Sequence, residues 1–190
     1  MKKITLFISL VLFTIITANT FAQSQEQMQK WMDYMTPGAM HQMLAKADGT
    51  WNEEITMWEA PDALPQKMTA SCENKMIMGG RYQESTTTGT FNNMPFEGHS
   101  LVGYDNVRKV FQSIWIDNMG TGIIHLEGTY DPSTKMLTLT GKQTDPMEGK
   151  ETDLKQTIKF IDDNNQLIEM YTTQNGKEFK MMEIKFTRKT

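Results

Sequence analysis

Five side chains in the middle of the chain are of the types that form ligand sites in proteins: His99, Trp115, Asp117, His125 and Glu127. Residues two apart on a strand share a face, so Trp115 pairs with Asp117, and His125 with Glu127. If the segments that carry them are neighbouring strands, these groups could cluster in a polar cavity and bind a metal ion or an acidic ligand. We predict these five residues as the ligand-binding candidates, and we assign no metal site.

An alternative interpretation of the same segment is purely structural. Ile124 and Leu126 form the apolar pair of their strand, which would direct His125 and Glu127 to solvent around an apolar cavity. The sequence favours this second arrangement without excluding the first.

Signatures of catalysis are missing from the sequence. Neither Gly-x-Ser-x-Gly nor HExxH occurs. The pairs Glu53-Glu54 and Asp162-Asp163 point to opposite faces if extended, and we expect them to be solvated charges. Cys72 is the only cysteine, so no disulfide forms within the chain, and we expect it to be a small strand residue. We predict no catalytic residue.

These candidates must be positioned by strands, because the pattern after Trp51 alternates between apolar and polar residues. Asp131-Pro132 and Asn175-Gly176 are examples of the turn signals between the runs. About ten strands with short links and no helical crossover predict an antiparallel meander. Closure would remove both exposed edges, so we predict an up-and-down β-barrel, with a β-sandwich as the alternative. The runs that follow the first strand are residues 67–78, 81–91, 101–104, 110–116, 123–130, 136–143, 154–161, 167–173 and 179–187.

One or two short helices are predicted before the barrel, within residues 23–46. The apolar residues recur at the helical spacing i, i+3, i+4 and i+7 in two stripes. Thr36-Pro37 separates the stripes and is typical of a helix N-cap followed by its first residue. The first stripe is Met28, Trp31, Met32 and Met35, and the second is Met40, Met43, Leu44 and Ala47.

The start of the sequence has the layout of a secretory signal peptide. Lys2 and Lys3 precede an apolar run, and cleavage is expected after Ala22. The run is short for a membrane span, so we expect an exported protein, periplasmic or extracellular, with no membrane span after cleavage. Removal of residues 1–22 leaves 17 basic and 23 acidic side chains, a net charge of −6, which argues against a nucleic-acid partner. We therefore expect a signal peptide at 1–22, a helical segment at 23–48 and a barrel domain at 49–190.

A set of short segments lies in order along nearly the whole mature chain. They are Leu44-Ala-Lys-Ala-Asp-Gly-Thr-Trp51, Gly79-Gly-Arg-Tyr82, Phe96-Glu-Gly98, Leu101-Val-Gly-Tyr-Asp105, Trp115-Ile-Asp-Asn-Met-Gly-Thr-Gly122, Glu127-Gly-Thr-Tyr-Asp131, Thr138-Leu-Thr-Gly141 and Met182-Glu-Ile-Lys-Phe-Thr-Arg188. Together they resemble the bacterial domain-of-unknown-function family fifteen seventy-nine. The resemblance implies a calycin-like barrel, akin to lipocalins and fatty-acid-binding proteins, and no established reaction.

A lipocalin-like start gives Trp51 a structural role. Gly49 would let the chain turn out of the helix, and Trp51 would plug the barrel floor. Arg188, near the end of the last strand, is the predicted partner through cation–π stacking. Some ten-stranded relatives hold haem through a late histidine, but no histidine follows His125, so we predict no cofactor.

Three functions remain open at the level of sequence. The favoured one is an exported barrel that binds a small apolar or amphipathic ligand without catalysis. A protein-interaction module, using a sheet edge or the Met-rich helices, is the alternative. An enzyme that uses His99, Asp117, His125 or Glu127 in a polar cavity is less favoured.

Overall fold

The computed structural model describes residues 25–174 and 176–189, and the chain divides into two compact units, Met1–Thr36 and Pro37–Thr190. The predicted signal peptide lies outside the described residues. In the first unit, residues 25–35 form a helix. Its predicted apolar stripe is exposed, and the rings of Trp31 and Tyr34 meet edge to face at 6.0 Å. Within the described part of the chain, no helix is both long and apolar enough to cross a membrane.

The second unit opens with α2 (Ala39–Ala45). Two helices are therefore present as predicted, but α2 begins later than Thr36-Pro37 indicated, because Gly38 is its N-cap. The Gly38 amide donates to His41 Nδ1 at 3.0 Å, which supplies a partner for the first turn. Thr36 instead ends the preceding helix, where its hydroxyl donates to the Met32 carbonyl at 2.6 Å.

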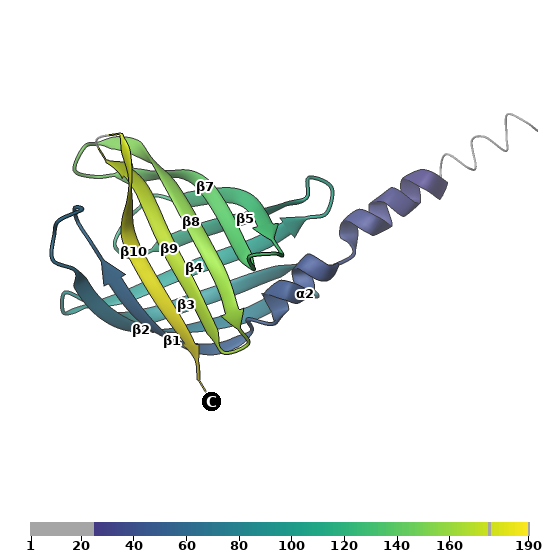
Figure 1. Ribbon diagram of the computed structural model, residues 1–190. Coiled ribbons are helices and arrows are strands. Elements are labelled where there is room, and N and C mark those ends of the chain that lie inside the picture. Colours follow the sequence, from purple (N-terminus) through teal and green to yellow (C-terminus); the bar gives the residue numbers. More distant parts are fainter. Residues whose placement is uncertain (1–24, 175, 190) are drawn as a thin grey trace, which may run out of the picture. The chain divides into compact units, whose positions relative to one another are not determined.

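Ten antiparallel strands close into a barrel in the order β1-β10-β9-β8-β7-β6-β5-β4-β3-β2, so each strand pairs with its sequence neighbours and β1 pairs with β10 (Figure 1). The predicted up-and-down barrel is confirmed, and the sandwich alternative is wrong. The strands are β1 (Gly49–Met57), β2 (Gln66–Ile77), β3 (Tyr82–Phe91), β4 (Met94–Asp105), β5 (Val110–Asp117), β6 (Ile124–Asp131), β7 (Met136–Asp145), β8 (Lys150–Asp162), β9 (Asn165–Gln174) and β10 (Lys177–Arg188).

Strand alternation divides every strand into an inner and an outer face, and the cross-strand register carries the inner face around the barrel. Trp51 of β1 pairs with Cys72 of β2, Cys72 with Thr87 of β3, and Thr87 with Gly98 of β4. All four are buried. The same parity continues on β5 through Phe111 and Ser113, which are also buried.

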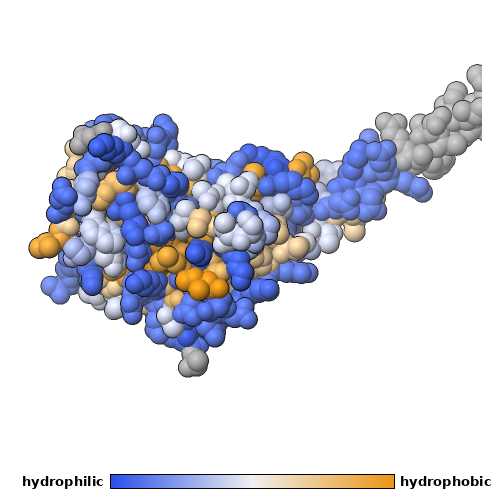
Figure 2. Space-filling view, in the orientation of Figure 1, coloured by the Kyte–Doolittle hydropathy of each residue, from blue (hydrophilic) through white to orange (hydrophobic). Residues whose placement is uncertain are grey.

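The apolar core occupies one arc of the inner wall. Phe111 on β5, Leu126 on β6, Leu137 and Leu139 on β7, and Leu154 on β8 are almost fully buried. Leu44 of α2 belongs to the same cluster, so the second helical stripe packs against the barrel. This packing positions α2 at one end of the barrel, the end marked by its label in Figure 1. On the outside, hydrophilic residues cover most of the face shown in Figure 2, and apolar residues lie in small groups.

Candidate functional site

Trp115 and Asp117 are the two predicted site residues that the structure brings together. They lie on the inner face of β5, and Trp115 Nε1 donates a hydrogen bond to Asp117 Oδ2 at 2.7 Å. The Trp115 ring stacks against Phe96 of β4 with ring centroids 6.5 Å apart. Beneath it lies Gly98, where an added Cβ would be only 2.4 Å from the indole ring. The glycine therefore makes room for the tryptophan on the inner wall.

The other three candidates lie on the outer face and do not converge with them. His99 Nε2 is 2.8 Å from Glu97 Oε1, and its Nδ1 is 3.3 Å from the Thr86 hydroxyl. His125 is exposed on β6. Glu127 accepts a hydrogen bond from Arg108 Nη2 at 2.6 Å, and this guanidinium lowers the pKa of the carboxyl. The arrangement with His125 and Glu127 pointing to solvent is the one that the structure has.

Glu53 is the inward-facing residue that the sequence interpretation missed. We expected a solvated charge, but only 3% of Glu53 is exposed, because it shares the inner face of β1 with Trp51 and Ile55. The Thr87 hydroxyl donates to its Oε1 at 3.2 Å, and the Cys72 thiol also contacts it. Burial raises the pKa of Glu53 to about 7, against the opposing effect of these two contacts. The signal was in the sequence, since Glu53 is two residues from each of two apolar neighbours.

The environment of Cys72 disfavours its thiolate form. The residue is buried between Glu53 and Asn74, and its Sγ donates to Asn74 Oδ1 at 3.2 Å. Burial and the neighbouring Glu53 carboxyl raise the pKa of the thiol to about 12. The thiolate is the nucleophilic form, so this cysteine is held in its unreactive state. Asn74 in turn donates to the Ala47 carbonyl at 3.1 Å, which joins this polar group to the end of the helix.

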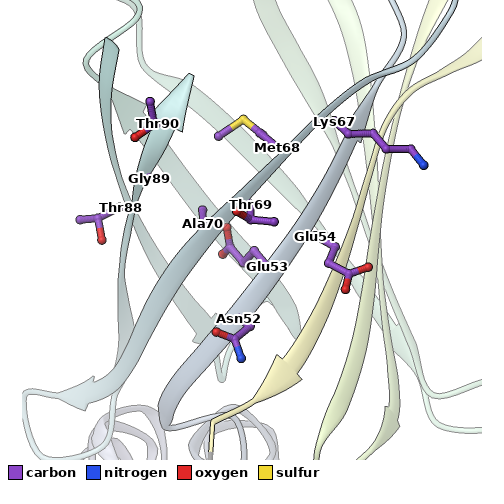
Figure 3. A pocket seen from close by; sticks show the side chains of 10 residues that line it. All are labelled: Asn52, Glu53, Glu54, Lys67, Met68, Thr69, Ala70, Thr88, Gly89 and Thr90. Atoms are coloured by element: carbon purple, nitrogen blue, oxygen red, sulfur yellow. The ribbon is translucent and has the colours of Figure 1, made fainter. Parts of the chain in front are cut away.

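A hollow of about 710 Å³ lies against β1, β2 and β3 (Figure 3). Its lining residues come from both faces of these strands, and Figure 3 shows Lys67 and Met68, neighbours on β2, extending to opposite sides. Ala70 and Gly89 pair across β2 and β3 and leave little side-chain volume there. The ten lining residues are Asn52, Glu53, Glu54, Lys67, Met68, Thr69, Ala70, Thr88, Gly89 and Thr90.

Trp51 and Arg188 close the end of the barrel beside α2. Trp51 is fully buried, its Nε1 donates to the Ala47 carbonyl at 2.8 Å, and the Arg188 guanidinium lies 4.2 Å from its ring centroid. Arg188 also donates to the carbonyls of Lys46 and Asp48, at 2.6 and 2.5 Å. These carbonyls follow α2, where a helix leaves its backbone acceptors unpaired, so the arginine fastens the helix to the barrel. Gly49 has φ +114°, and an added Cβ would meet this guanidinium at 3.0 Å.

The inner wall is incompletely packed along β8, β9 and β10. Gln156, Met170 and Met182 follow one another across these strands in register. They continue the inner face from the fully buried Leu139, which pairs with Gln156. All three are nevertheless only half-buried in the middle of their strands. Side chains that fill a barrel bury one another, so packing at these three residues is looser than in the arc from Phe111 to Leu154.

The fold and the inner wall define a closed ten-stranded antiparallel β-barrel with a polar and aromatic strip inside it. The chain belongs to the family described as a protein of unknown function (DUF1579), whose model matches residues 36–188. The calycin-like resemblance seen in the sequence agrees with this assignment.

The barrel is also similar to a solved structure, the Rv2717c protein from M. tuberculosis. The two share 14% sequence identity with a TM-score of 0.59, over 82% of this chain and 100% of that one. At this identity the likeness concerns the fold alone. No curated protein matches the chain.

Proposed function

We propose that this protein binds a small apolar or amphipathic molecule inside its barrel, without catalysing a reaction. The observation that carries the proposal is the partial burial of Gln156, Met170 and Met182 on the inner face of β8–β10, in contrast to the fully buried arc from Phe111 to Leu154. An apolar ligand seated there would gain about 25 cal/mol for each Å² of apolar surface removed from water. Closure of one end by α2, Trp51 and Arg188 leaves the other end for entry.

A neutral fluorescent probe tests this proposal. N-phenyl-1-naphthylamine brightens in apolar surroundings, and we expect saturable brightening with one probe per barrel. The variant Gln156→Trp adds bulk to the inner face, and we expect it to weaken probe binding at least tenfold. The matched control is Lys159→Trp, which adds the same ring to an exposed outer position of the same strand. Equal binding by both variants, or no saturable binding by the parent protein, would contradict a lumen site.

Export is part of the same proposal, and it rests on the sequence of residues 1–22 alone. Expression of the full chain in a Gram-negative host, followed by mass measurement, should give a product that begins at Gln23 in the periplasm or medium. Retention of Met1 in a cytoplasmic product would contradict it.

A protein-interaction role is the second candidate, because apolar side chains lie on the outer face of β4 and β5. Leu101 and Ile114 pair across these strands, and Ile116 lies two residues further along β5. All three are substantially exposed, at 36%, 40% and 45%. Exposed apolar groups of this kind mark interfaces when they form a continuous patch. Replacing Ile114 and Ile116 by threonine should abolish such an interaction while leaving probe binding in the lumen unchanged.

A further inference from the structure

Between its two ends, the inner wall of the barrel carries carboxyl groups and no basic side chain among the described residues. The inward-facing carboxyls of the described strands include Glu53 on β1 and Asp117 on β5. Among the described inward-facing residues, Lys and Arg occur only at the two ends of the barrel, at Lys150, Lys177 and Arg188. Lys150, the first residue of β8, contacts Glu148, and Arg188 is held over Trp51 and by backbone carbonyls. The wall between these ends therefore offers an anion no basic partner.

No cation among the described residues is paired with Glu53. Its contacts among the described residues are the Thr87 hydroxyl and the Cys72 thiol, both neutral. An ionised carboxyl that is buried without a cation is strongly disfavoured, and a cation brought beside it removes most of that penalty. Glu53 also lines the hollow against β1–β3, where Figure 3 shows its carboxyl beside Ala70.

The register connects Glu53 to the aromatic group of β4 and β5. Thr87, which binds Glu53, is paired with Gly98, and the Trp115 ring lies over Gly98. Asp117 is the next pair across from Gly98 and accepts the indole N–H of Trp115. One strip of the inner wall therefore carries two carboxyls with an aromatic surface between them. Carboxylates and aromatic faces together are the groups that recognise alkylammonium ions.

We propose that the ligand is an amphiphile with a protonated amine, whose ammonium group pairs with Glu53 and whose hydrocarbon part packs against Met170 and Met182 on the half-buried inner face of β9 and β10. This inference rests on the proposed function, since it specifies the ligand of the same lumen. The inner strip repels carboxylates, so a fatty acid is the wrong ligand for this barrel. Met170 and Met182 supply the apolar surface for the hydrocarbon part, and β10 pairs with β1, the strand that carries Glu53.

Three probes of equal chain length test the charge preference: decylamine, decanol and decanoate, each titrated below its micelle concentration by isothermal calorimetry at neutral pH. We expect decylamine to bind at least tenfold more tightly than decanol, and decanoate to bind most weakly. Glu53→Gln keeps the shape of the side chain and should remove the preference for the amine while leaving decanol binding unchanged. Glu54→Gln is the matched control, because Glu54 is the adjacent carboxyl on the exposed outer face.

Each outcome decides between the two proposals. Equal binding of all three probes, or tighter binding of decanoate, overturns the amine inference and leaves the lumen site intact. Binding of none of them overturns both. An amine preference that persists in Glu53→Gln overturns the role of this residue. If that variant does not fold, the ranking of the three probes on the parent protein decides, and Thr87→Val, which removes the hydroxyl partner of Glu53, should change the amine affinity more than the decanol affinity.

Discussion

Trp51 and Trp115 both face the inside of the barrel, but their surroundings differ. Trp51 is fully buried, its indole N–H is bound by a backbone carbonyl, and Arg188 covers its ring. Trp115 is half-buried, its indole N–H is bound by the side chain of Asp117, and its ring lies on a glycine. A backbone carbonyl partner and close packing make Trp51 part of the closed end. Trp115 has a carboxyl partner and remains partly exposed.

Of the substitutions that test this difference between the two tryptophans, the one at the closed end should lower the free energy of unfolding most. Trp51→Ala should lower the free energy of unfolding by about 3–5 kcal/mol, because it leaves a cavity and removes the support for Arg188. Trp115→Ala is the matched control and should cost roughly 1–2 kcal/mol, since less apolar surface is buried there. Urea unfolding followed by circular dichroism measures both. A smaller loss for Trp51→Ala than for Trp115→Ala would reverse the assignment of the two residues.

The buried carboxyl of Glu53 predicts a pH dependence of stability. Its pKa is raised from 4.5 to about 7 in the folded protein, so the neutral form is favoured by folding. The resulting stability is complete below pH 4.5 and is lost as the pH rises through about 7. The loss is at most roughly 3 kcal/mol, the free energy that corresponds to this change in pKa.

Urea unfolding of the parent protein and of Glu53→Gln across this pH window measures the loss. The variant should lack this part of the pH dependence, whereas Glu54→Gln should retain it. Parallel curves for the parent protein and Glu53→Gln would show that Glu53 titrates normally.

Substitution of Gly98 tests how tightly the Trp115 ring is packed against β4. Gly98→Ala places a methyl group within 2.4 Å of the indole, so the ring must move, at a cost of roughly 1–3 kcal/mol. The double variant Gly98→Ala/Trp115→Leu should recover most of that loss, because the two residues are in contact. Additive losses in a double-mutant cycle would mean that the backbone, and not the indole ring, resists the methyl group.

Strand alternation and turn residues in the sequence were sufficient to predict the barrel. The short links left an antiparallel meander as the simple solution, and the residues 66–77 of β2 differ from the predicted run 67–78 by one position at each end. The start of β4 was missed, since Met94 to Ser100 contains Pro95 and Gly98, which are unfavourable in strands. Pairing with β3 stabilises this segment, and that long-range contact is not visible in the local pattern.

The candidate site was harder to predict, because chemistry-bearing residue types do not reveal which face they occupy. Trp115 and Asp117 were predicted to share a face because they are two residues apart on a strand. Glu53 was predicted to be a solvated charge because it is a glutamate next to another glutamate. Its burial follows from its neighbours on the face and from closure of the barrel, which is a property of the whole fold. The strip that joins Glu53 to Trp115 depends on the register of four strand pairings, which no short stretch of sequence specifies.

The smallest expected effects belong to the outer-face candidates. His125→Ala should change the free energy of unfolding by no more than about 0.5 kcal/mol, as is usual for an exposed position without special contacts. Binding of decylamine and of N-phenyl-1-naphthylamine should change less than twofold, because the side chain points away from the lumen. His99→Ala should likewise leave binding unchanged, since its partners Glu97 and Thr86 also lie outside. A tenfold loss of binding in either variant would place the ligand on the outer surface of β4–β6, and the inner strip of Glu53 and Trp115 would then have to be explained as structure alone.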